Sequence, residues 1–217
     1  MADGGQDPRM AAQEAVRALR ERITHLGDDA IDLILKDARS HYAWSPKPVS
    51  DDLLREIFEI TVSGPTSMNT CPARFVFVRS LASKTRLAKS LKAKNIDKMM
   101  AAPVTAIVAW DPDFWKKLDF LFPHEDRKPH FEGKPDHSHD TAFRNSTLQG
   151  AYFMIAARAV GLDVGAMSGF SNAVVDEEFF SVNGWKSNFL CNIGYADETA
   201  LFQKLPRFGF DDVCEVI

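Results

Sequence analysis

The fold is decided by the stretch Gly64-Pro65-Thr66-Ser67-Met68-Asn69-Thr70-Cys71-Pro72-Ala73-Arg74 and the apolar run Phe75-Val76-Phe77-Val78 that follows it. Each proline fixes its own φ and biases the residue before it away from the helical region, so the intervening polar groups lie on a stiffened loop. The apolar run is typical of a strand, and because both of its faces are apolar we predict a central strand. The loop itself has two interpretations at this point: a ligand-binding loop, or a helix-to-strand connection rich in turn formers.

Outward from this stretch, the chain reads as amphipathic helices and short strands. Ser50 is a suitable N-cap for a helix that runs to Val62, with Val49 packing against Leu54. Further helices are predicted over residues 16–26, 29–38, 84–91, 95–100 and 172–180. Further strands are predicted over residues 105–110 and 187–195, with a small-residue strand and loop over 163–170.

The strongest predicted helix covers residues 141–160, which are apolar around most of the helix circumference and are therefore expected to be central and buried. Residues 111–140 before it show no sustained periodicity, which favours a lid, a binding loop or disorder. Helices outnumber strands and do not alternate with them in regular βαβ order, so the predicted class is α+β. Neither GxGxxG nor GxxxxGK[ST] occurs in the chain, which argues against a Rossmann unit and a P-loop.

Composition indicates an ordinary soluble globular protein, with 217 residues, 45% of them apolar and 26% charged. The net charge of -4 and the lack of a basic block argue against nucleic acid or an anionic membrane as a partner. Three cysteines without a CxxC pair favour a reducing compartment, here the cytoplasm. Residues 1–9 are polar and no apolar run approaches the roughly 18 residues of a membrane span, so we expect neither a signal peptide nor an anchor.

Two short constellations have the chemistry of a binding site. Arg39, Ser40 and His41 combine a guanidinium, a hydroxyl and an imidazole, which suit a phosphate, although a cationic helix C-terminus is the alternative. Asn95 and Lys98 share one helix face and are placed to reach the hydroxyls and the charge of a ligand together, whereas the alternative is a solvated pair.

Neither a metal site nor a catalytic nucleophile is predicted. A metal site is conceivable because six ligand-type side chains lie close in sequence: His124, His130, His137, His139, Asp136 and Asp140. However, no HExxH-like spacing occurs and lysines and prolines interrupt the stretch, which favours a solvated lid, so no metal is predicted. Cys71 is interpreted as an inert thiol because no His or Asn partner can be assigned to it, and no GxSxG elbow is present.

Five segments, taken together, carry a family pattern: Ala38-Arg39-Ser40-His41, Gly64 to Arg74, Asn95 with Lys98-Met99, Gly165-Ala166-Met167-Ser168-Gly169-Phe170, and Lys204-Leu205-Pro206-Arg207. They resemble the nitroreductase superfamily of FMN-binding proteins, most closely its malonic semialdehyde reductase branch from bacterial pyrimidine degradation. The resemblance implies a mostly antiparallel sheet flanked by helices, in an intertwined homodimer. It implies one FMN-binding domain over residues 29–217, whereas residues 1–28 form a helical extension outside the family pattern.

The resemblance also implies roles for single residues. The set that holds the FMN phosphate and one flavin edge is Arg39, Ser40, His41, Lys204 and Arg207. The set that contacts the ribityl chain, the pyrimidine edge and the region of flavin N5 is Asn95, Lys98, Met167, Ser168 and Gly169. The set that reaches the flavin from the partner subunit is Pro65, Thr66, Ser67 and Asn69. Of these, Lys98 and Ser168 are the expected catalytic residues, since Lys98 stabilises negative charge on the reduced flavin.

The activity implied by the resemblance is a hydride relay. NADH or NADPH reduces FMN at N5, and malonic semialdehyde then accepts the hydride at its carbonyl carbon to give 3-hydroxypropionate. The substrate carboxylate needs a cation, for which Arg74 and Arg144 are the candidates. Two alternatives stay open: an NAD(P)H-dependent nitro or quinone reductase that uses the same FMN, and a non-catalytic flavin-binding partner protein.

Overall fold

The computed structural model describes residues 7–23 and 25–217 and divides into two compact units, Met1–Ala38 and Arg39–Ile217. Within the first unit, α1 (Pro8–Arg22) begins at Asp7, whose side chain accepts a hydrogen bond from the Arg9 N–H. It starts earlier and ends earlier than the predicted helix of residues 16–26, of which Thr24 lies outside the described residues. Then α2 (Asp28–Ile31) continues into a π-helical turn (Asp32–Lys36), close to the predicted helix of residues 29–38. Residues 1–6 of the predicted polar N-terminus also lie outside the described residues.

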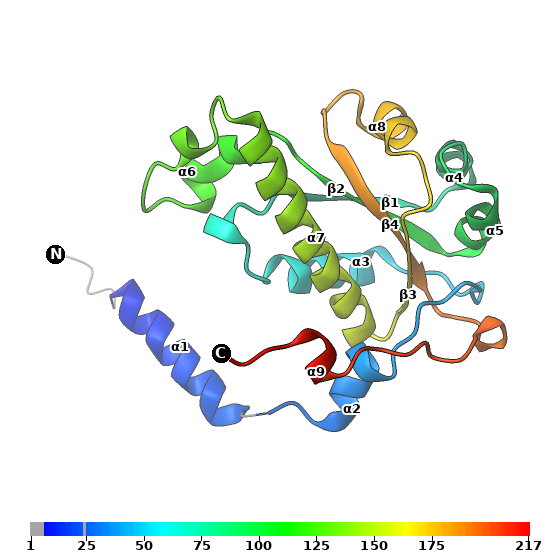
Figure 1. Ribbon diagram of the computed structural model, residues 1–217, viewed down its shortest axis with the longest axis horizontal. Coiled ribbons are helices and arrows are strands. Elements are labelled where there is room, and N and C mark those ends of the chain that lie inside the picture. Colours follow the sequence, from blue (N-terminus) through cyan, green and yellow to red (C-terminus); the bar gives the residue numbers. More distant parts are fainter. Residues whose placement is uncertain (1–6, 24) are drawn as a thin grey trace. The chain divides into compact units, whose positions relative to one another are not determined.

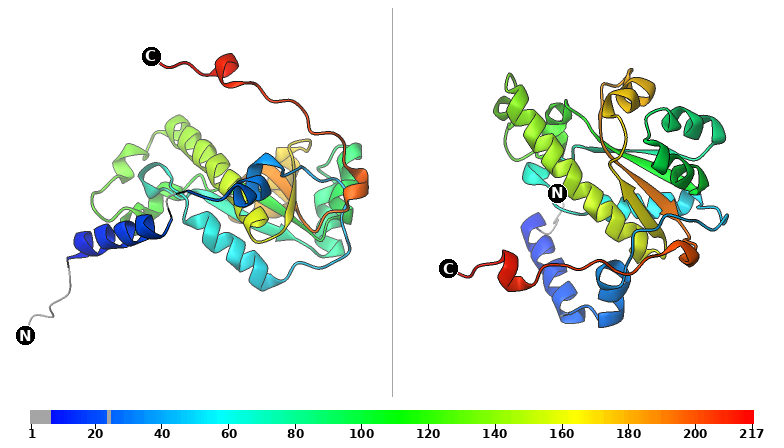
Figure 2. Two further views of the ribbon diagram at one scale, coloured as in Figure 1. Left: turned by 90° about the horizontal axis from the view of Figure 1, so that it is seen from below. Right: turned by 45° about the vertical axis from the view of Figure 1, so that its right-hand side comes forward.

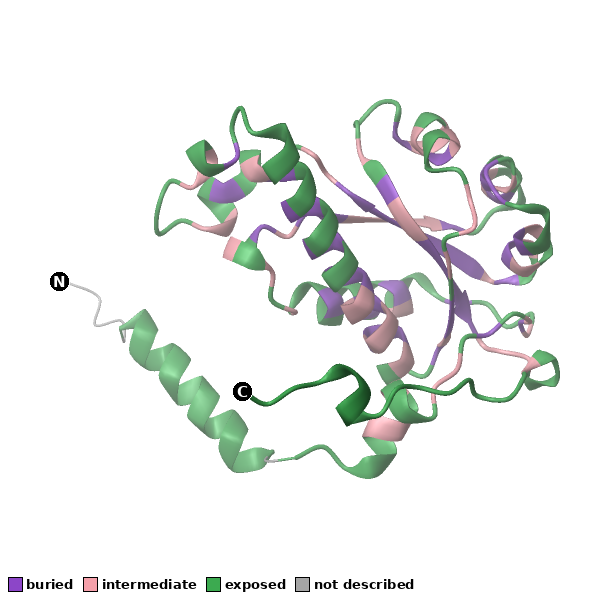
Figure 3. Ribbon diagram, viewed as in Figure 1, coloured by how far each residue is buried: buried purple, intermediate pink, exposed green. Residues whose placement is uncertain are grey.

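The second unit is built on a four-stranded antiparallel sheet with strand order β1-β2-β4-β3 (Figure 1). The strands are β1 (Ala73–Val78), β2 (Val104–Trp110), β3 (Asp163–Met167) and β4 (Lys186–Gly194). Every residue of β2 is buried, which agrees with its position inside the sheet (Figure 3). The α+β class is therefore confirmed.

The position predicted for β1 is wrong, because β1 is an edge strand. Its apolar residues on both faces have another cause. Phe75 and Phe77 pack into one core cluster and Val76 and Val78 into the other, so helices cover both faces of this edge. An apolar run of this kind indicates that both faces of the strand are covered by other elements. It does not indicate where the strand lies in the sheet.

Two helical layers enclose the sheet. One face packs against α3 (Asp51–Val62) and α7 (Pro135–Ala159), around core side chains such as Ile57 and Phe153. The other face packs against α4 (Leu81–Ala88), α5 (Ala93–Ala101) and α8 (Asn172–Phe180), around Leu87 and Met99 (Figure 1). The predicted cap of α3 is confirmed, since the Ser50 hydroxyl accepts the Leu53 N–H.

Residues 111–134 are more ordered than predicted. They contain two 3-10 turns (Phe114–Lys117 and Lys128–His130) and α6 (Leu118–Leu121), and residues 135–140 already belong to α7. Their aromatic and aliphatic side chains form a third core cluster, in which Phe114, Leu118 and Phe131 pack with Trp110 and Ala142. These side chains therefore form a small satellite core. The sequence of residues 111–134 shows no helical or strand periodicity because the backbone turns repeatedly.

The chain ends in an extended arm, residues 201–217, which carries only the single turn α9 (Phe210–Val213) (Figure 2). Its large apolar side chains are exposed: Phe202, Leu205, Phe208, Phe210, Val213, Val216 and Ile217. None of the helices in the described part of the chain has the length and apolar character to cross a lipid bilayer.

Candidate functional site

The residues after Ala38 are joined to the start of β3 by backbone pairing. Ser40 forms a parallel bridge with Val164, and the His41 N–H donates to the Val164 carbonyl at 3.0 Å. The approach is so close that a Cβ on Gly165 would lie 2.4 Å from the His41 carbonyl oxygen. Glycine is therefore required at position 165, and the segment 39–42 is fixed on β3.

His41 is a buried imidazole with one unused nitrogen. Only 8% of the residue is exposed, and its Nε2 lies 3.3 Å from the Asp163 carboxylate. Its Nδ1 is buried and has no hydrogen-bond partner among the residues that the structure describes. Burial lowers the pKa of His41, a shift that Asp163 opposes and that Arg158 and Arg39 strengthen. A buried polar atom without a partner is unusual in a protein interior and marks a position where a ligand is able to complete the bonding.

Helix α5 is joined to the loop that follows β3. The Asn95 side-chain amide donates to the Gly169 carbonyl at 3.2 Å, and the Lys92 N–H donates to the same oxygen at 3.1 Å. A short bridge between Leu91 and Phe170 continues the connection. The predicted residues Asn95 and Gly169 are thus direct neighbours, although 74 positions separate them in the chain.

The other end of α5 is held by a buried lysine. Lys84 of α4 donates from Nζ to the Met100 carbonyl at 3.0 Å and also to the Ala102 carbonyl. Burial lowers the pKa of Lys84. A cation at a helix C-terminus interacts favourably with the helix dipole and satisfies terminal carbonyls, so Lys84 fixes the end of α5. The burial of Lys84 depends on carbonyl partners that lie outside its own helix, at the end of α5.

Lys98 of α5 is half-buried, and its ammonium lies over an aromatic ring. Its Nζ is 4.3 Å from the centroid of Tyr42, the residue that follows His41. Together, residues 39–42, residues 92–98 and residues 164–169 form one connected group, which we call the α5/β3 cluster. It contains eight of the predicted site residues: Arg39, Ser40, His41, Asn95, Lys98, Met167, Ser168 and Gly169.

Residues 65–71, which we call the 65–71 loop, have a different set of contacts. The Ser67 N–H donates to the buried Asn145 side chain of α7 at 2.8 Å, and the Asn69 amide donates to the Leu121 carbonyl of α6 at 2.8 Å. The Tyr152 hydroxyl donates to the Pro65 carbonyl, and the Thr66 hydroxyl accepts the Cys71 N–H. The loop is therefore fastened to α6 and α7.

The loop also carries unusual backbone geometry. Within residues 7–23 and 25–217, the non-glycine residues with positive φ are Met68 at 48°, Asn69 at 51° and Cys71 at 40°. This left-handed region is sterically unfavourable for residues with a Cβ, and such strain persists only where surrounding contacts impose it. Three strained positions within one loop mark it as a candidate functional segment.

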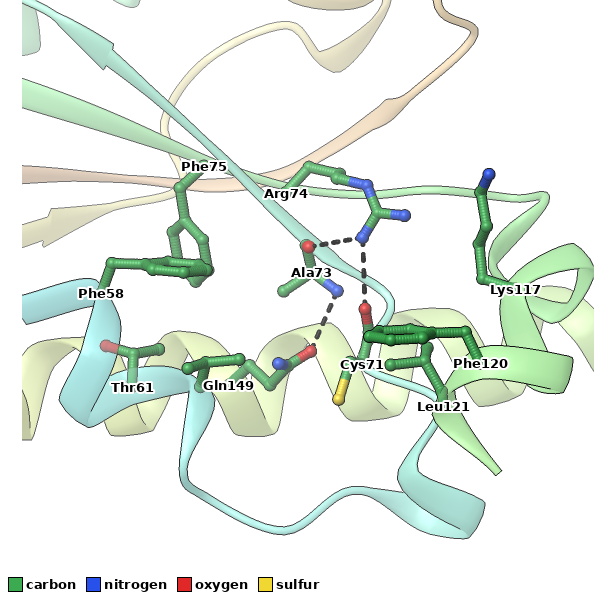
Figure 4. Close-up of a pocket in the computed structure, with 11 residues that line it drawn as sticks. Phe58, Thr61, Cys71, Ala73, Arg74, Phe75, Lys117, Phe120, Leu121 and Gln149 are labelled. Carbon is green, nitrogen blue, oxygen red and sulfur yellow. Dashed lines mark hydrogen bonds between the residues drawn. The ribbon is translucent and has the colours of Figure 1, made fainter. Parts of the chain in front are cut away.

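Arg74 points into a pocket of about 250 Å³ at the start of β1 (Figure 4). Its guanidinium is already engaged, with Asp111 at 2.7 Å and with the carbonyls of Cys71, Pro72 and Ala73. The pocket wall is largely aromatic and aliphatic, with Phe58, Phe75, Phe120 and Leu121, and Lys117 supplies a second cation. Arg144, the other predicted substrate residue, is exposed on α7.

Lys204 and Arg207 lie on the exposed C-terminal arm. Arg207 donates to the carbonyls of Leu205 and Pro206 within the arm. The arm begins beside the α5/β3 cluster, because the Arg39 guanidinium donates to the Phe202 carbonyl. The structure therefore places Lys204 two residues beyond a direct contact with Arg39.

Sequence reasoning missed three residues of this region: Tyr42, Lys84 and Asn192, whose contacts with α5 all come from other elements. Tyr42 carried a weak signal, since it directly follows Arg39-Ser40-His41. Lys84 and Asn192 carried none, because their roles depend on which carbonyls other elements bring to them.

The chain folds as an antiparallel sheet between helical layers, and polar and basic residues gather at α5 and β3. These features are those of an α+β protein with a polar ligand site beside its sheet. The family model described as the nitroreductase family matches residues 35–195, and the chain belongs to this family.

Individual relatives agree with this. The chain is 50% identical over 192 residues, 88% of its length and 98% of the relative's, to a protein of Rhodopseudomonas palustris (strain TIE-1) named "Putative NADH dehydrogenase/NAD(P)H nitroreductase". Among solved structures it resembles a "putative nitroreductase in complex with FMN" from Exiguobacterium sibiricum 255-15, with a TM-score of 0.76, 21% identity and coverage of 90% of this chain and 100% of that one. A nitroreductase family protein from Streptococcus pneumoniae TIGR4 aligns with a TM-score of 0.72, 23% identity and coverage of 85% and 98%. These likenesses confirm the nitroreductase-like fold.

Proposed function

We propose that this protein is an FMN-dependent NAD(P)H oxidoreductase that reduces malonic semialdehyde to 3-hydroxypropionate. Membership of the nitroreductase family and the names of the relatives support the oxidoreductase class. The observation that carries the proposal for this chain is the α5/β3 cluster, in which His41 keeps an unused imidazole nitrogen, the Asn95 amide donates to the Gly169 carbonyl and the Lys98 ammonium lies over Tyr42.

The residues of this cluster fit FMN. The guanidinium of Arg39 would supply donors of the kind that charge-assisted phosphate binding needs. The buried Nδ1 of His41, which no described residue bonds, is an acceptor when the Nε2–H donates to Asp163, so it would suit an N–H or hydroxyl of the cofactor. The Gly165 position, which a Cβ would fill, lets the 39–42 segment approach β3 closely. Ser40 and the arm residues Lys204 and Arg207 would complete the phosphate site. Met167, Ser168 and Gly169 offer backbone groups to the flavin ring.

When bound, FMN would supply the hydride chemistry that connects NADH or NADPH with the acceptor. The aldehyde gains this hydride at carbon and a proton at oxygen, so that aldehyde, NAD(P)H and H⁺ become alcohol and NAD(P)⁺. Lys98 would hold a positive charge toward the pyrimidine edge of the bound flavin, where preorganised charge is worth a few kcal/mol. Asn95 orients the 168–169 loop, and Ser168 offers its N–H and hydroxyl at the reacting face.

Arg74 and Arg144 are proposed to bind the substrate carboxylate. Arg144 is exposed on α7, whereas Arg74 must share its guanidinium with Asp111. Arg144→Ala is therefore expected to raise KM for malonic semialdehyde more than Arg74→Lys does. Equal KM values for wild type and Arg144→Ala would remove Arg144 from the site.

The site is proposed to be completed in a homodimer, with Pro65, Thr66, Ser67 and Asn69 serving the flavin of the second chain. Support comes from the contacts of this loop, which run to α6 and α7, and from its strained backbone. The exposed apolar side chains of the C-terminal arm also favour a partner surface. Sedimentation is expected to give a dimer with one FMN per chain, and a monomer that retains FMN would contradict the proposal.

Flavin content and turnover test the proposed function directly. Purified protein should be yellow, and anaerobic NADH or NADPH should bleach the flavin absorbance. Flavin that stays oxidised with both reductants would exclude an NAD(P)H oxidoreductase. Arg39→Ala is expected to lose about tenfold in FMN affinity, whereas Cys71→Ala, which carries no assigned contact to FMN, should retain it. Equal FMN content in the two variants would refute the phosphate role of Arg39.

A nitro or quinone reductase is the second candidate, because the pocket beside Arg74 is lined mainly by apolar and aromatic side chains (Figure 4). A wall formed by Phe58, Phe75 and Phe120 suits a flat aromatic acceptor. Turnover with malonic semialdehyde and with a nitroaromatic, measured on the same preparation, decides between the two activities. Equal or faster nitroaromatic reduction would argue against a dedicated aldehyde reductase. The cytoplasmic location stays a prediction, in keeping with three free cysteines.

A further inference from the structure

Lys98 is held at both of its ends by residues that belong to no predicted site. Its backbone carbonyl accepts a hydrogen bond from the Asn192 amide at 3.2 Å, and its ammonium lies 4.3 Å from the Tyr42 ring centroid. We propose that Tyr42 and Asn192 are positioning residues that fix the charge of Lys98 relative to the flavin and so set the preference of the site for reduced over oxidised FMN. This inference rests on the proposed function, since it requires FMN beside α5.

Asn192 connects α5 to the middle of the sheet. It lies on β4 with 1% of its surface exposed, and its side-chain oxygen accepts the hydroxyl of Thr105 on β2 at 2.7 Å. Thr105 is itself fully buried. Both halves of the amide are therefore used, the oxygen within the sheet and the nitrogen on Lys98. Because a buried amide is costly to leave unpaired, this pair fixes the position of α5 against the sheet at the residue that carries the charge.

Tyr42 holds the other end of the same residue. An ammonium within about 6 Å of an aromatic centroid is attracted by the negative face of the ring. Tyr42 follows His41, so the ring is anchored through the backbone pairing of residues 40 and 41 with Val164. The flexible side chain of Lys98 is thereby restricted on the side that faces residues 39–42, the segment proposed to bind the phosphate.

The position of this charge matters because reduction adds negative charge to the flavin. The interaction of two charges falls with their separation, and an ammonium held in place needs no rearrangement when the negative charge appears. A lysine freed from Tyr42 or from Asn192 would sample longer distances. The expected consequence is weaker binding of reduced FMN, with little change in the binding of oxidised FMN.

A double-mutant cycle tests the Tyr42 contact. The dissociation constants of oxidised and dithionite-reduced FMN are measured for wild type, Tyr42→Phe, Tyr42→Leu, Lys98→Gln and the Tyr42→Leu/Lys98→Gln double variant. Lys98→Gln should lower the preference for reduced FMN about tenfold, which corresponds to about 30 mV for a two-electron couple. Tyr42→Leu should lower it about threefold, and Tyr42→Phe, which keeps the ring, should retain the wild-type value. In the Lys98→Gln background, Tyr42→Leu should have no further effect.

The structure offers matched controls for both contacts. Tyr195→Leu removes a second cation–π pair, in which Lys47 Nζ lies 3.7 Å from the ring centroid, away from α5. Asn188→Ala removes an amide of the same strand whose partners are Ser146 and Thr147 of α7. Neither control should alter the preference for reduced FMN. Asn192→Ala should lower it about threefold, and Thr105→Val, which removes only the hydroxyl partner, provides a second variant if Asn192→Ala fails to fold.

The outcomes separate this inference from the proposed function. Wild-type protein that does not bind FMN overturns both. Wild-type protein that binds FMN, with the same preference in Tyr42→Leu, Asn192→Ala or Thr105→Val as in wild type, overturns the inference alone. A Tyr42→Leu effect that persists in the Lys98→Gln background also overturns it, because the ring would then act without Lys98.

Discussion

The α5/β3 cluster and the 65–71 loop are both candidate ligand surfaces, yet they are held in different ways. In the cluster, backbone bridges join Ser40 to Val164 and Leu91 to Phe170, and the buried side chains of Asn95 and Lys84 fix the start and the end of α5. In the loop, side chains of α7 and the backbone of α6 hold a segment that contains three left-handed residues. The cluster is a continuation of the sheet, whereas the strained conformation of the loop is maintained by its contacts with α6 and α7. Changes in the cluster should therefore affect folding and ligand binding together, and changes in the loop should affect chiefly its local geometry.

The largest expected effect comes from adding a methyl group to Gly165 of the cluster and to Gly64, which directly precedes the loop. In Gly165→Ala the new Cβ meets the His41 backbone oxygen at 2.4 Å, so the 39–42 segment must leave β3, at a cost of about 3 kcal/mol in the free energy of unfolding. In Gly64→Ala it meets the Tyr152 ring at 2.2 Å, and the cost should be nearer about 1.5 kcal/mol because a side chain can rotate.

Urea unfolding of the two variants measures this difference. Gly209→Ala is the control, since its nearest neighbour is at an ordinary 3.4 Å. A Gly64→Ala variant less stable than Gly165→Ala would reverse the comparison between the two regions.

The next effect concerns the support of the loop. Asn145 is buried, accepts the Ser67 N–H and donates to the Thr141 carbonyl. Asn145→Ala removes both hydrogen bonds and is expected to cost about 2 kcal/mol. Asn172→Ala is the control, because it removes two hydrogen bonds from a side-chain amide to Ser187, away from the loop. Limited proteolysis should cut Asn145→Ala within residues 65–71 and should not do so in the control. Identical digests would show that the loop does not depend on α7.

A smaller effect is the pH dependence that His41 gives to the cluster. Burial holds its pKa below the ordinary value of 6.5, so above pH 6.5 the imidazole is neutral in both the folded and the unfolded chain. As the pH falls below 6.5, the unfolded chain binds a proton before the folded chain does, and stability decreases until the folded pKa is reached. Thermal unfolding at about pH 7.5 and about pH 5.5, on either side of this value, should show a larger loss for wild type than for His41→Gln. A variant with an equal or larger loss would place the titrating group elsewhere.

The smallest expected change is in cysteine labelling, which distinguishes the 65–71 loop from the buried sheet without a mutation. Burial raises the pKa of Cys191 on β4 to about 12, so this thiol should not react in the native protein. Cys71 in the loop is half-buried and Cys214 is exposed. A thiol reagent at about pH 8, near the ordinary pKa of a thiol, should therefore label two cysteines before unfolding and the third only after it. Added FMN should slow labelling of Cys71 and leave Cys214 unchanged, whereas equal rates would argue against a loop that faces the flavin.

The features that could be predicted from the sequence are local ones. The Ser50 cap of α3, the bounds of α8 and the strand that became β2 depend on neighbouring residues and on apolar runs. The start of α7 was misplaced because His137 and Asp140 look like loop residues, although Pro135 at the first helical turn is a common helix start. The edge position of β1 could not be predicted from the sequence, because strand order depends on pairings between distant segments.

In the candidate site, too, the residues that could be predicted are those recognised from local sequence, and the residues that were missed depend on distant partners. Residue types that suit a phosphate or a flavin edge identified Arg39, His41, Asn95 and Lys98, and the structure brings these together. Tyr42 and Asn192 were missed because an aromatic ring and a strand amide have no special meaning until their partner is known. The buried position of Lys84 was missed for the same reason.

The strand order has a consequence for how the chain is made. Strand β3 pairs only with β4 among the described strands, and β4 also supplies the second neighbour of β2. Until residues 186–194 have left the ribosome, β3 has no strand to pair with and half of the sheet cannot form. Synthesis proceeds at about 5–20 residues per second, so residues 163–167 wait for residues 186–194 while their apolar surface is exposed. Ribosome-bound chains that stop before Lys186 are therefore expected to bind chaperones more than chains that include β4.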